Sequence, residues 1–289
     1  MSENQNSSKI SALIAEAESE LKKVSDTPRL DAEILLAKAL KTGRFELWVK
    51  SGETVSETER EIFESFVARR INFEPVAYIT NEKEFFEDTF FVDRRVLIPR
   101  PESEFTVEEA VSAMKNAGKA EVLDICCGSG CIGLSVKRMT NCSLTLSDIS
   151  GDALDVAGIN AKRLFPDHND ILFVQSDLFE NITGEFDVIT ANPPYLSNED
   201  MKNFVVKDLK FEPENAFFGG ENGFEITGKI IGSVSKFLKP DGVFITELGY
   251  EGPAFLKETV SGLKLLKTVK DYSGITRVAV FRKTVNFKI

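Results

Sequence analysis

The sequence predicts an α/β protein with a doubly wound, mostly parallel sheet and a small N-terminal helical domain. Apolar residues recur at helical spacing up to about residue 72, and strand-like and helix-like segments alternate from residue 101 onward. Between them lies a stretch rich in aromatic and β-branched residues. We therefore expect a helical domain at 1–72, a β-hairpin linker at 73–100 and a sheet domain at 101–289.

The first segment contains three runs with the period of an amphipathic helix. Their apolar positions are Ile10, Leu13, Ile14, Ala17 and Leu21, then Ala32, Leu35, Leu36 and Ala39, and finally Ile62, Phe63, Phe66 and Val67. Pro28 interrupts the pattern between the first and second runs. These runs indicate packed helices and carry no sign of chemistry.

The linker has few helix formers, so short strands or a hairpin are expected in FEPVAYIT (73–80) and in the aromatic run that follows it. Pro99 and Pro101 flank Arg100 and exclude continuous regular structure there.

After residue 101 helices and strands alternate. The expected elements are a helix at 103–117, a strand at 121–125, a helix at 131–139, a strand at 142–148, a helix at 153–159, strands at 171–174, 186–191 and 242–248, and an antiparallel pair at 265–269 and 277–281. In such a sheet, ligands bind at the carboxyl ends of the strands, near the point where the strand order reverses. The residues that follow each strand are therefore the candidates for a binding site.

The composition excludes several classes of protein. A net charge of −11 and a pI near 4.9 disfavour direct binding of nucleic acid. The N-terminus lacks the features of a signal peptide, and no apolar run approaches the roughly 20 residues of a membrane span, so we expect a cytoplasmic protein with no membrane partner. The four cysteines and the one histidine, His168, fit neither a disulfide framework nor a metal site nor histidine-dependent catalysis.

A glycine turn follows the strand at 121–125. It reads Asp124-Ile125-Cys126-Cys127-Gly128-Ser129-Gly130, and its two glycines let the backbone approach a ligand closely. The next strand ends at Asp148, whose carboxylate can accept both hydroxyls of a ribose. The pair favours a nucleoside-type cofactor over a plain structural turn. The sequence lacks the full motifs of dinucleotide and ATP sites, which disfavours NAD and ATP.

The next two strand ends add further polar groups. Asp177 can accept the exocyclic amine of an adenine, with Leu178 or Phe179 over a ring face, although this position also suits a helix N-cap. The fourth strand runs into Asn192-Pro193-Pro194-Tyr195. The prolines free backbone carbonyls beside the Asn192 oxygen, so the cluster can grip a planar amino group, while the alternative is a rigid exit from the sheet.

Together these segments resemble a class I S-adenosylmethionine-dependent methyltransferase, a Rossmann-like fold, of the amino-methylating type. More specifically, the chain resembles the HemK/PrmC family, whose members methylate the glutamine N5 in the Gly-Gly-Gln motif of peptide chain release factors. The matching positions also include residues 74–78 and 96–104, Glu212-Pro213, Gly219-Gly220 and Gly223. The run Ile98-Pro99-Arg100-Pro101-Glu102 beside a helical domain points to the release-factor branch.

This resemblance implies S-adenosylmethionine as cofactor, S-adenosylhomocysteine as product and no metal. The residues implied to hold the cofactor are Cys126, Cys127, Gly128, Ser129 and Gly130 for the methionine part, Asp148 for the ribose, Asp177 and Leu178 for the adenine, and Asn192 at its edge. The residues implied to bind the substrate glutamine are Asn192, Pro193, Pro194 and Tyr195. Of these, the Asn192 oxygen and the Pro193 carbonyl accept the amide hydrogens, and Tyr195 packs against the substrate.

The resemblance also implies that a release factor docks on the N-terminal helices and the 73–100 hairpin. A local basic cluster stands out in this acidic chain, either as part of that surface or as ordinary solvated charge. Its members are Arg69, Arg70, Arg94, Arg95 and Arg100.

One position departs from the family pattern. Cys126 stands where the family usually has glycine, and Cys127 where it has a small hydroxyl residue. We expect an ordinary backbone angle at Cys126 and a side chain beside the cofactor, which weakens cofactor affinity without loss of function.

Three alternatives stay open from the sequence. They are a glutamine methyltransferase of a ribosomal protein, an adenine-N6 methyltransferase acting on a flipped nucleic-acid base, and a cofactor-binding protein without turnover. The acidic pI argues against the second and the intact Asn-Pro-Pro-Tyr cluster against the third.

Overall fold

A computed structural model describes residues 9–115, 119–167, 169–203, 209–249 and 262–284, together with residues 252 and 256. Contacts within the chain divide it into two compact units, residues 1–82 and 83–289, and each is described by itself. His168 and residues 116–117 lie outside the described residues, and the helix expected at 103–117 ends at Ala113.

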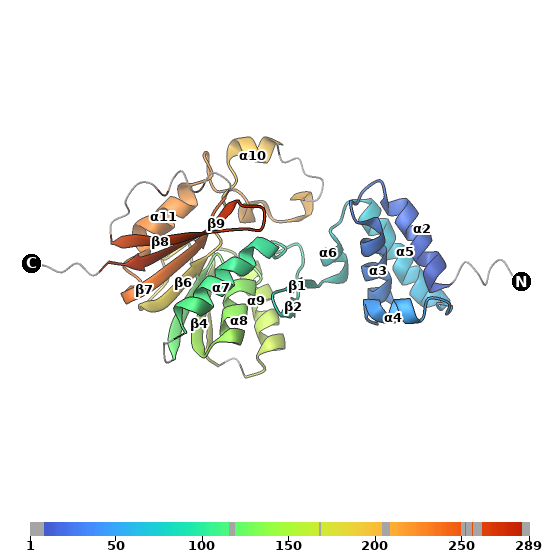
Figure 1. The fold of residues 1–289 in the computed structure, drawn as a ribbon, viewed down its shortest axis with the longest axis horizontal. Helices are drawn as coiled ribbons and strands as arrows, with labels where there is room; N and C mark the ends of the chain where they lie inside the picture. The colour runs from blue at the N-terminus through green and yellow to red at the C-terminus, as the bar shows by residue number, and fades with distance from the viewer. Residues whose placement is uncertain are drawn as a thin grey trace, which may run out of the picture. The chain divides into compact units, whose positions relative to one another are not determined.

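The first unit is helical, as predicted (Figure 1). Its helices are α2 (Ile10–Leu21), α3 (Pro28–Ala39), α4 (Arg44–Val49), α5 (Glu57–Ile71) and α6 (Val76–Thr80). Pro28 begins α3, because a proline at the first helical position gives up no hydrogen bond. Ser56 and Glu59 form a capping box that starts α5. The predicted apolar faces are buried in one core, with the exceptions of Phe66, which is half-buried, and Ile62, which is 38% exposed.

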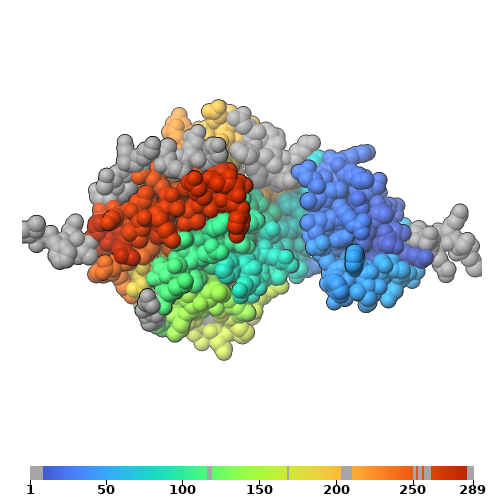
Figure 2. All heavy atoms as spheres, viewed as in Figure 1, coloured from blue at the N-terminus to red at the C-terminus, as the bar shows by residue number. Residues whose placement is uncertain are grey.

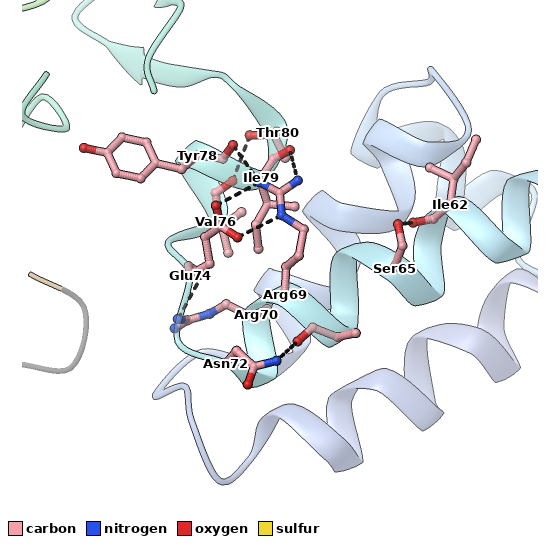
Figure 3. Close-up of polar contacts among 11 residues, drawn as sticks. Ile62, Ser65, Arg69, Arg70, Asn72, Glu74, Val76, Tyr78, Ile79 and Thr80 are labelled. Atoms are coloured by element: carbon pink, nitrogen blue, oxygen red, sulfur yellow. Dashed lines mark hydrogen bonds and ion pairs between the residues drawn. The ribbon is translucent and has the colours of Figure 1, made fainter. Parts of the chain in front are cut away.

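The short helix α6 corrects the prediction of strands across residues 73–80. Arg69 bonds the Glu74 carboxylate through Nε at 2.8 Å and Nη2 at 2.9 Å and reaches the Ile79 carbonyl oxygen at 3.5 Å (Figure 3). The Thr80 hydroxyl donates to the Val76 carbonyl oxygen at 3.0 Å. These local bonds satisfy the backbone within one helical turn, so they override the strand preference of the β-branched and aromatic side chains.

The second unit opens with the expected hairpin, formed by β1 (Lys83–Phe85) and β2 (Asp88–Phe90). The Phe85 and Phe90 rings meet edge to face, with centroids 6.0 Å apart, and both are buried. Their burial fixes the hairpin against the core of this unit.

Seven strands of the described residues form one twisted sheet, and the predicted doubly wound fold is confirmed. They are β3 (Ala120–Ile125), β4 (Cys142–Asp148), β5 (Ile171–Gln175), β6 (Phe186–Ala191), β7 (Leu238–Glu247), β8 (Leu263–Lys270) and β9 (Thr276–Lys283). The order is β5-β4-β3-β6-β7-β9-β8, in which the first five strands are parallel and β9 and β8 are antiparallel additions. The strand order reverses between β3 and β6, which makes their carboxyl ends the expected binding site.

Helices cover both faces of this sheet. The helices α7 (Glu104–Ala113), α8 (Cys131–Met139) and α9 (Gly151–Leu164) share one core with Val122 of β3. The adjacent Leu123 points to the other face and packs with α11 (Glu225–Val234), a helix that the sequence analysis missed. In the view of Figure 2, β8 and β9 (red) lie beside α7 (green), where Lys267 pairs with Glu109 at 2.7 Å.

Short elements complete the second unit. They are the 3₁₀ turns η1 (Pro101–Ser103), η2 (Leu209–Phe211) and η3 (Glu214–Ala216) and the helix α10 (Asn198–Asn203). Across the described ranges, no helix combines the length and apolar character needed to cross a membrane.

Candidate functional site

A cavity of about 300 Å³ lies at the carboxyl ends of the central parallel strands of the second unit. Predicted site residues that line it are Cys126, Cys127, Gly128, Ser129, Asp148, Asp177, Leu178, Asn192 and Pro194. Gly130, Pro193 and Tyr195 are not part of its lining, although each neighbours a residue that is. The structure thus brings four strand ends together around one hollow, as the topology requires.

The glycine turn after β3 bends sharply before α8 begins. Gly128 and Gly130 have φ angles of 53° and 77°. The Gly130 amide donates to the Cys127 carbonyl oxygen at 2.7 Å, and the Cys127 amide donates to the Ser147 carbonyl oxygen at 3.0 Å. These bonds hold the turn against the end of β4, with its backbone facing the cavity.

Cys126 adopts a φ of 56°, so the prediction of an ordinary backbone angle at this position is wrong. The chain must leave β3 and turn into the glycine loop here, and this left-handed conformation costs a residue with a Cβ roughly 1–2 kcal/mol. Burial, together with the nearby Asp148 carboxylate, raises the pKa of the Cys126 thiol well above its ordinary value. The thiol is therefore a neutral, unreactive group in the cavity wall.

Asp148 ends β4 with both carboxylate oxygens engaged. The Gly128 amide donates to one oxygen and the Ser150 amide to the other, each at 2.9 Å. Burial raises the pKa of Asp148, and these backbone donors oppose that rise. Each oxygen keeps a further lone pair, so the carboxylate can still accept two ligand hydroxyls.

Asp177 and Leu178 follow β5 at the rim of the cavity. Asp177 is exposed, and residues 178–180 form a turn, so the alternative interpretation of Asp177 as a helix N-cap is wrong. Leu178 has a φ of 49° and is half-buried. A carboxylate beside an apolar side chain suits a planar base that carries an amino group.

Asp124 lies within the central strand β3 and is 1% exposed. Its carboxylate accepts the Thr190 hydroxyl at 2.7 Å and the Gly133 amide at 3.0 Å. Burial raises the pKa of Asp124 to about 7, and both hydrogen bonds oppose the rise. These two hydrogen bonds tie β3 to β6 and α8. Asp124 does not line the cavity, so its role is structural.

The cluster after β6 is joined to two residues that sequence reasoning missed. The Asn192 amide nitrogen donates to the Ser103 hydroxyl oxygen at 3.1 Å, and that hydroxyl donates to Glu247 Oε2 at 2.6 Å. The Tyr195 hydroxyl lies 3.5 Å from Glu247 Oε1. Burial raises the pKa of Glu247 to about 7 and that of the Tyr195 phenol well above its ordinary value. The signal that the sequence offered was an acidic residue at the carboxyl end of the apolar strand β7.

The backbone after this cluster is packed too closely for a side chain. A Cβ at Gly219 would lie 2.5 Å from the Pro194 carbonyl oxygen and 2.8 Å from Tyr195 Cα. Glycine at this position therefore lets the loop around residue 219 pack against residues 192–195, the predicted binding site of the substrate amide, called the substrate grip below.

Comparison with known proteins gives the family. Residues 12–80 match the PrmC N-terminal domain and residues 108–217 match the methyltransferase small domain. The release factor glutamine methyltransferase of Leptospira interrogans is 37% identical over 281 residues, covering 95% of this chain and 98% of the relative. That of Koribacter versatilis is 38% identical over 262 residues, covering 89% and 92%. The chain belongs to the release factor glutamine methyltransferase family.

Membership of this family confirms the predicted resemblance and the assignment as a methyltransferase. Among solved structures, the chain is similar to a methyltransferase from Pyrococcus furiosus. The match covers 75% of this chain and 98% of the other, with 20% identity and a TM-score of 0.49.

The arginines of the basic cluster are mostly neutralised in this family member. Arg69 pairs with Glu74 at 2.8 Å, Arg70 with Asp31 at 2.9 Å, Arg95 with Asp93 at 2.7 Å and Arg100 with Glu212 at 2.6 Å, and Arg94 stacks 4.9 Å from the Phe211 ring centroid. The charges therefore serve the packing of each unit more than an open basic surface.

Glu212 also accepts the Ile98 amide at 2.9 Å. With Arg100, this buried carboxylate ties the 98–100 segment to the loop after the Asn192–Tyr195 cluster, and both segments border the cavity. Over the parts of the chain that the structure describes, no three His, Cys, Asp or Glu side chains are grouped to hold a metal ion.

Proposed function

We propose that this protein transfers a methyl group from S-adenosyl-L-methionine to the side-chain N5 of the glutamine in the Gly-Gly-Gln motif of peptide chain release factors. It would thereby act in translation termination, in the cytoplasm, on a protein partner and without direct binding of nucleic acid. The observation that carries the proposal is the Asn192–Tyr195 cluster, which borders a nucleoside-sized cavity at the switch point of the sheet.

The cavity fits the proposed cofactor by size and by chemistry. Its volume of about 300 Å³ is at the small end of ligand sites, and its lining joins apolar side chains with a few placed polar groups. Asp148 has free lone pairs for the two ribose hydroxyls, and Asp177 and Leu178 present an acceptor and an apolar face for adenine. The 126–130 turn offers backbone groups to the methionine part. When bound, the cofactor supplies an electrophilic methyl group on a sulfonium, and we propose that no metal takes part.

The chain's own groups then hold the nucleophile. An amide nitrogen is a poor nucleophile because its lone pair is delocalised into the carbonyl. The Asn192 Oδ1 and the Pro193 carbonyl oxygen would accept its two hydrogens, and Tyr195 would pack against its plane. As the nitrogen gains the methyl group it becomes positive, so these acceptor bonds strengthen in the transition state. The proton leaves after transfer, when the nitrogen is strongly acidic, so no histidine base is required.

Docking of the release factor is proposed for the N-terminal helices, residues 1–72, with the hairpin of the 73–100 segment. The helix α4 presents three large apolar side chains to solvent. Phe45, Trp48 and Val49 are 75%, 76% and 70% exposed. Exposed aromatic groups of this kind are typical of protein-binding surfaces.

The test is methyl transfer from labelled S-adenosylmethionine to a purified release factor, compared with the same factor carrying Gln→Ala in its Gly-Gly-Gln motif. Label on the first and none on the second is the expected result. No label on either, with S-adenosylhomocysteine still bound, would refute the release-factor assignment and favour ribosomal-protein or nucleic-acid substrates.

A further inference from the structure

The two polar side chains of the substrate grip converge on one buried carboxylate. Ser103 and Glu247 are each 2% exposed. Ser103 comes from η1, before α7, and Glu247 ends β7, so three segments far apart in the chain meet at this point. Burial excludes water from these hydrogen bonds, so each donor and acceptor depends on its protein partner.

The chemistry of this relay determines which way the Asn192 amide faces. Above about pH 7, the pKa that burial gives Glu247, the group is an ionised carboxylate that only accepts hydrogen bonds, so the single Ser103 proton points to Glu247, 2.6 Å away. Towards Asn192, the Ser103 oxygen then has only lone pairs to offer. The group 3.1 Å away must therefore be the Asn192 nitrogen, which places Oδ1 on the opposite side of the amide.

We propose that Ser103 and Glu247 are positioning residues that hold the Asn192 amide in the one orientation that presents its oxygen to the substrate glutamine. This inference rests on the proposed function, in which Oδ1 accepts a hydrogen of the substrate amide. A flipped Asn192 would present an N–H group there instead, and two donors would face each other.

Glu247 also faces groups other than Ser103. The Tyr195 hydroxyl lies near its second oxygen. The positive charge of Arg277 lowers the pKa of Glu247, and the negative charge of Glu102 raises it. Arg277 is itself paired with Asp271 at 2.8 Å. Glu247 thus anchors both ends of the grip, Asn192 through Ser103 and Tyr195 directly.

The test is a double-mutant cycle on the full-length enzyme at about pH 8.5, where Glu247 is ionised, with release factor as substrate and saturating cofactor. The variants are Ser103→Ala, Ser103→Thr, Asn192→Ala and the Ser103→Ala/Asn192→Ala pair. Ser103→Ala should lower kcat about tenfold while binding of S-adenosylhomocysteine stays within about twofold, and Ser103→Thr should restore most of the loss. The pair should be no slower than Asn192→Ala alone, because Ser103 acts through Asn192.

A second variant covers the case in which Ser103→Ala does not fold. Glu247→Met replaces the buried carboxylate with an uncharged chain of similar length. It frees the Ser103 proton to donate to either side of the Asn192 amide, so kcat should again fall about tenfold. Unchanged kcat in Ser103→Ala or Glu247→Met, or losses that add fully in the pair, would overturn the inference.

A readout independent of turnover separates this inference from the proposed function. In ¹⁵N-labelled protein, the Asn192 side-chain amide resonances should shift and exchange faster in Ser103→Ala than in wild type. Unchanged resonances would overturn the relay even if the enzyme is active. A wild-type enzyme that leaves the release factor unmethylated would refute the proposed function, while the amide resonances still test the relay.

Discussion

The Asp148 carboxylate accepts the Gly128 amide at 2.9 Å, which joins the end of β4 to the glycine turn after β3. The same carboxylate accepts the Ser150 amide, so its position is fixed before any ligand arrives. In the proposed ribose-binding role, a carboxylate held in this way would lose little freedom on binding, which favours affinity.

Replacement of Asp148 by Ala should weaken binding of S-adenosylhomocysteine about 10- to 100-fold, because charge-assisted bonds to the ribose are lost. Isothermal titration calorimetry measures the effect. Asp152→Ala is the matched control, since this exposed aspartate lies on α9 outside the cavity lining. Equal affinity in Asp148→Ala and wild type would contradict the ribose role.

The left-handed backbone at Cys126 predicts a difference between two small substitutions. Both Cys126→Ala and Cys126→Gly remove the sulfur, but only glycine adopts this conformation without strain. Cys126→Gly should therefore be more stable than Cys126→Ala by about 1 kcal/mol. Chemical denaturation gives both free energies of unfolding. A more stable Ala variant would show that the φ angle of 56° is not strained in solution.

Asp124 predicts a dependence of stability on pH. Its pKa is about 7 in the folded protein, against an ordinary value of 3.8, so the folded state retains a proton that the unfolded chain has released. The stabilisation is complete below the unfolded value and is lost as pH rises through about 7.

Relative to the isosteric Asp124→Asn variant, the wild type should lose on the order of 3 kcal/mol between about pH 4 and about pH 8. Denaturant unfolding at several pH values measures this difference. A constant difference between the two proteins across that range would show that Asp124 titrates normally.

If the exposed aromatic side chains of α4 contact the release factor, their removal should weaken binding of that substrate and leave cofactor binding unchanged. Trp48→Ala should raise KM for the release factor about tenfold or more, in the manner of an interface hot spot, while cofactor binding is unchanged. Ile62→Ala, at a partly exposed site of α5 in the same unit, should behave as wild type. A Trp48→Ala enzyme with normal KM would place docking elsewhere.

The sequence predicted most of the sheet because each central strand is a short apolar run followed by a polar or glycine turn, a pattern tied directly to topology. The positions of Asp148 and Asn192 at strand ends were predicted for the same reason, while their roles in binding stay predictions. Residues 76–80 were assigned wrongly because polar bonds from Arg69 and Thr80, invisible to composition, stabilise a helix there.

Other features depend on contacts between distant segments. Ser103 and Glu247 come together beside Asn192 only because η1 and β7 meet in the fold. They are 144 residues apart in the sequence, so the sequence alone does not predict their hydrogen bond. The left-handed angle at Cys126 was missed because cysteine, unlike glycine, does not indicate a positive φ. A glycine at that position, as in the family pattern, would have predicted it.

In the proposed reaction, Asn192 binds the side-chain amide of the Gly-Gly-Gln glutamine. The most direct measurement is mass spectrometry of release factor after reaction with wild-type enzyme and with Asn192→Ala. We expect one methyl group on that glutamine with the wild type, and initial rates at least about a hundredfold lower with the variant. A methyl group on another residue, or equal rates with the two enzymes, would contradict it.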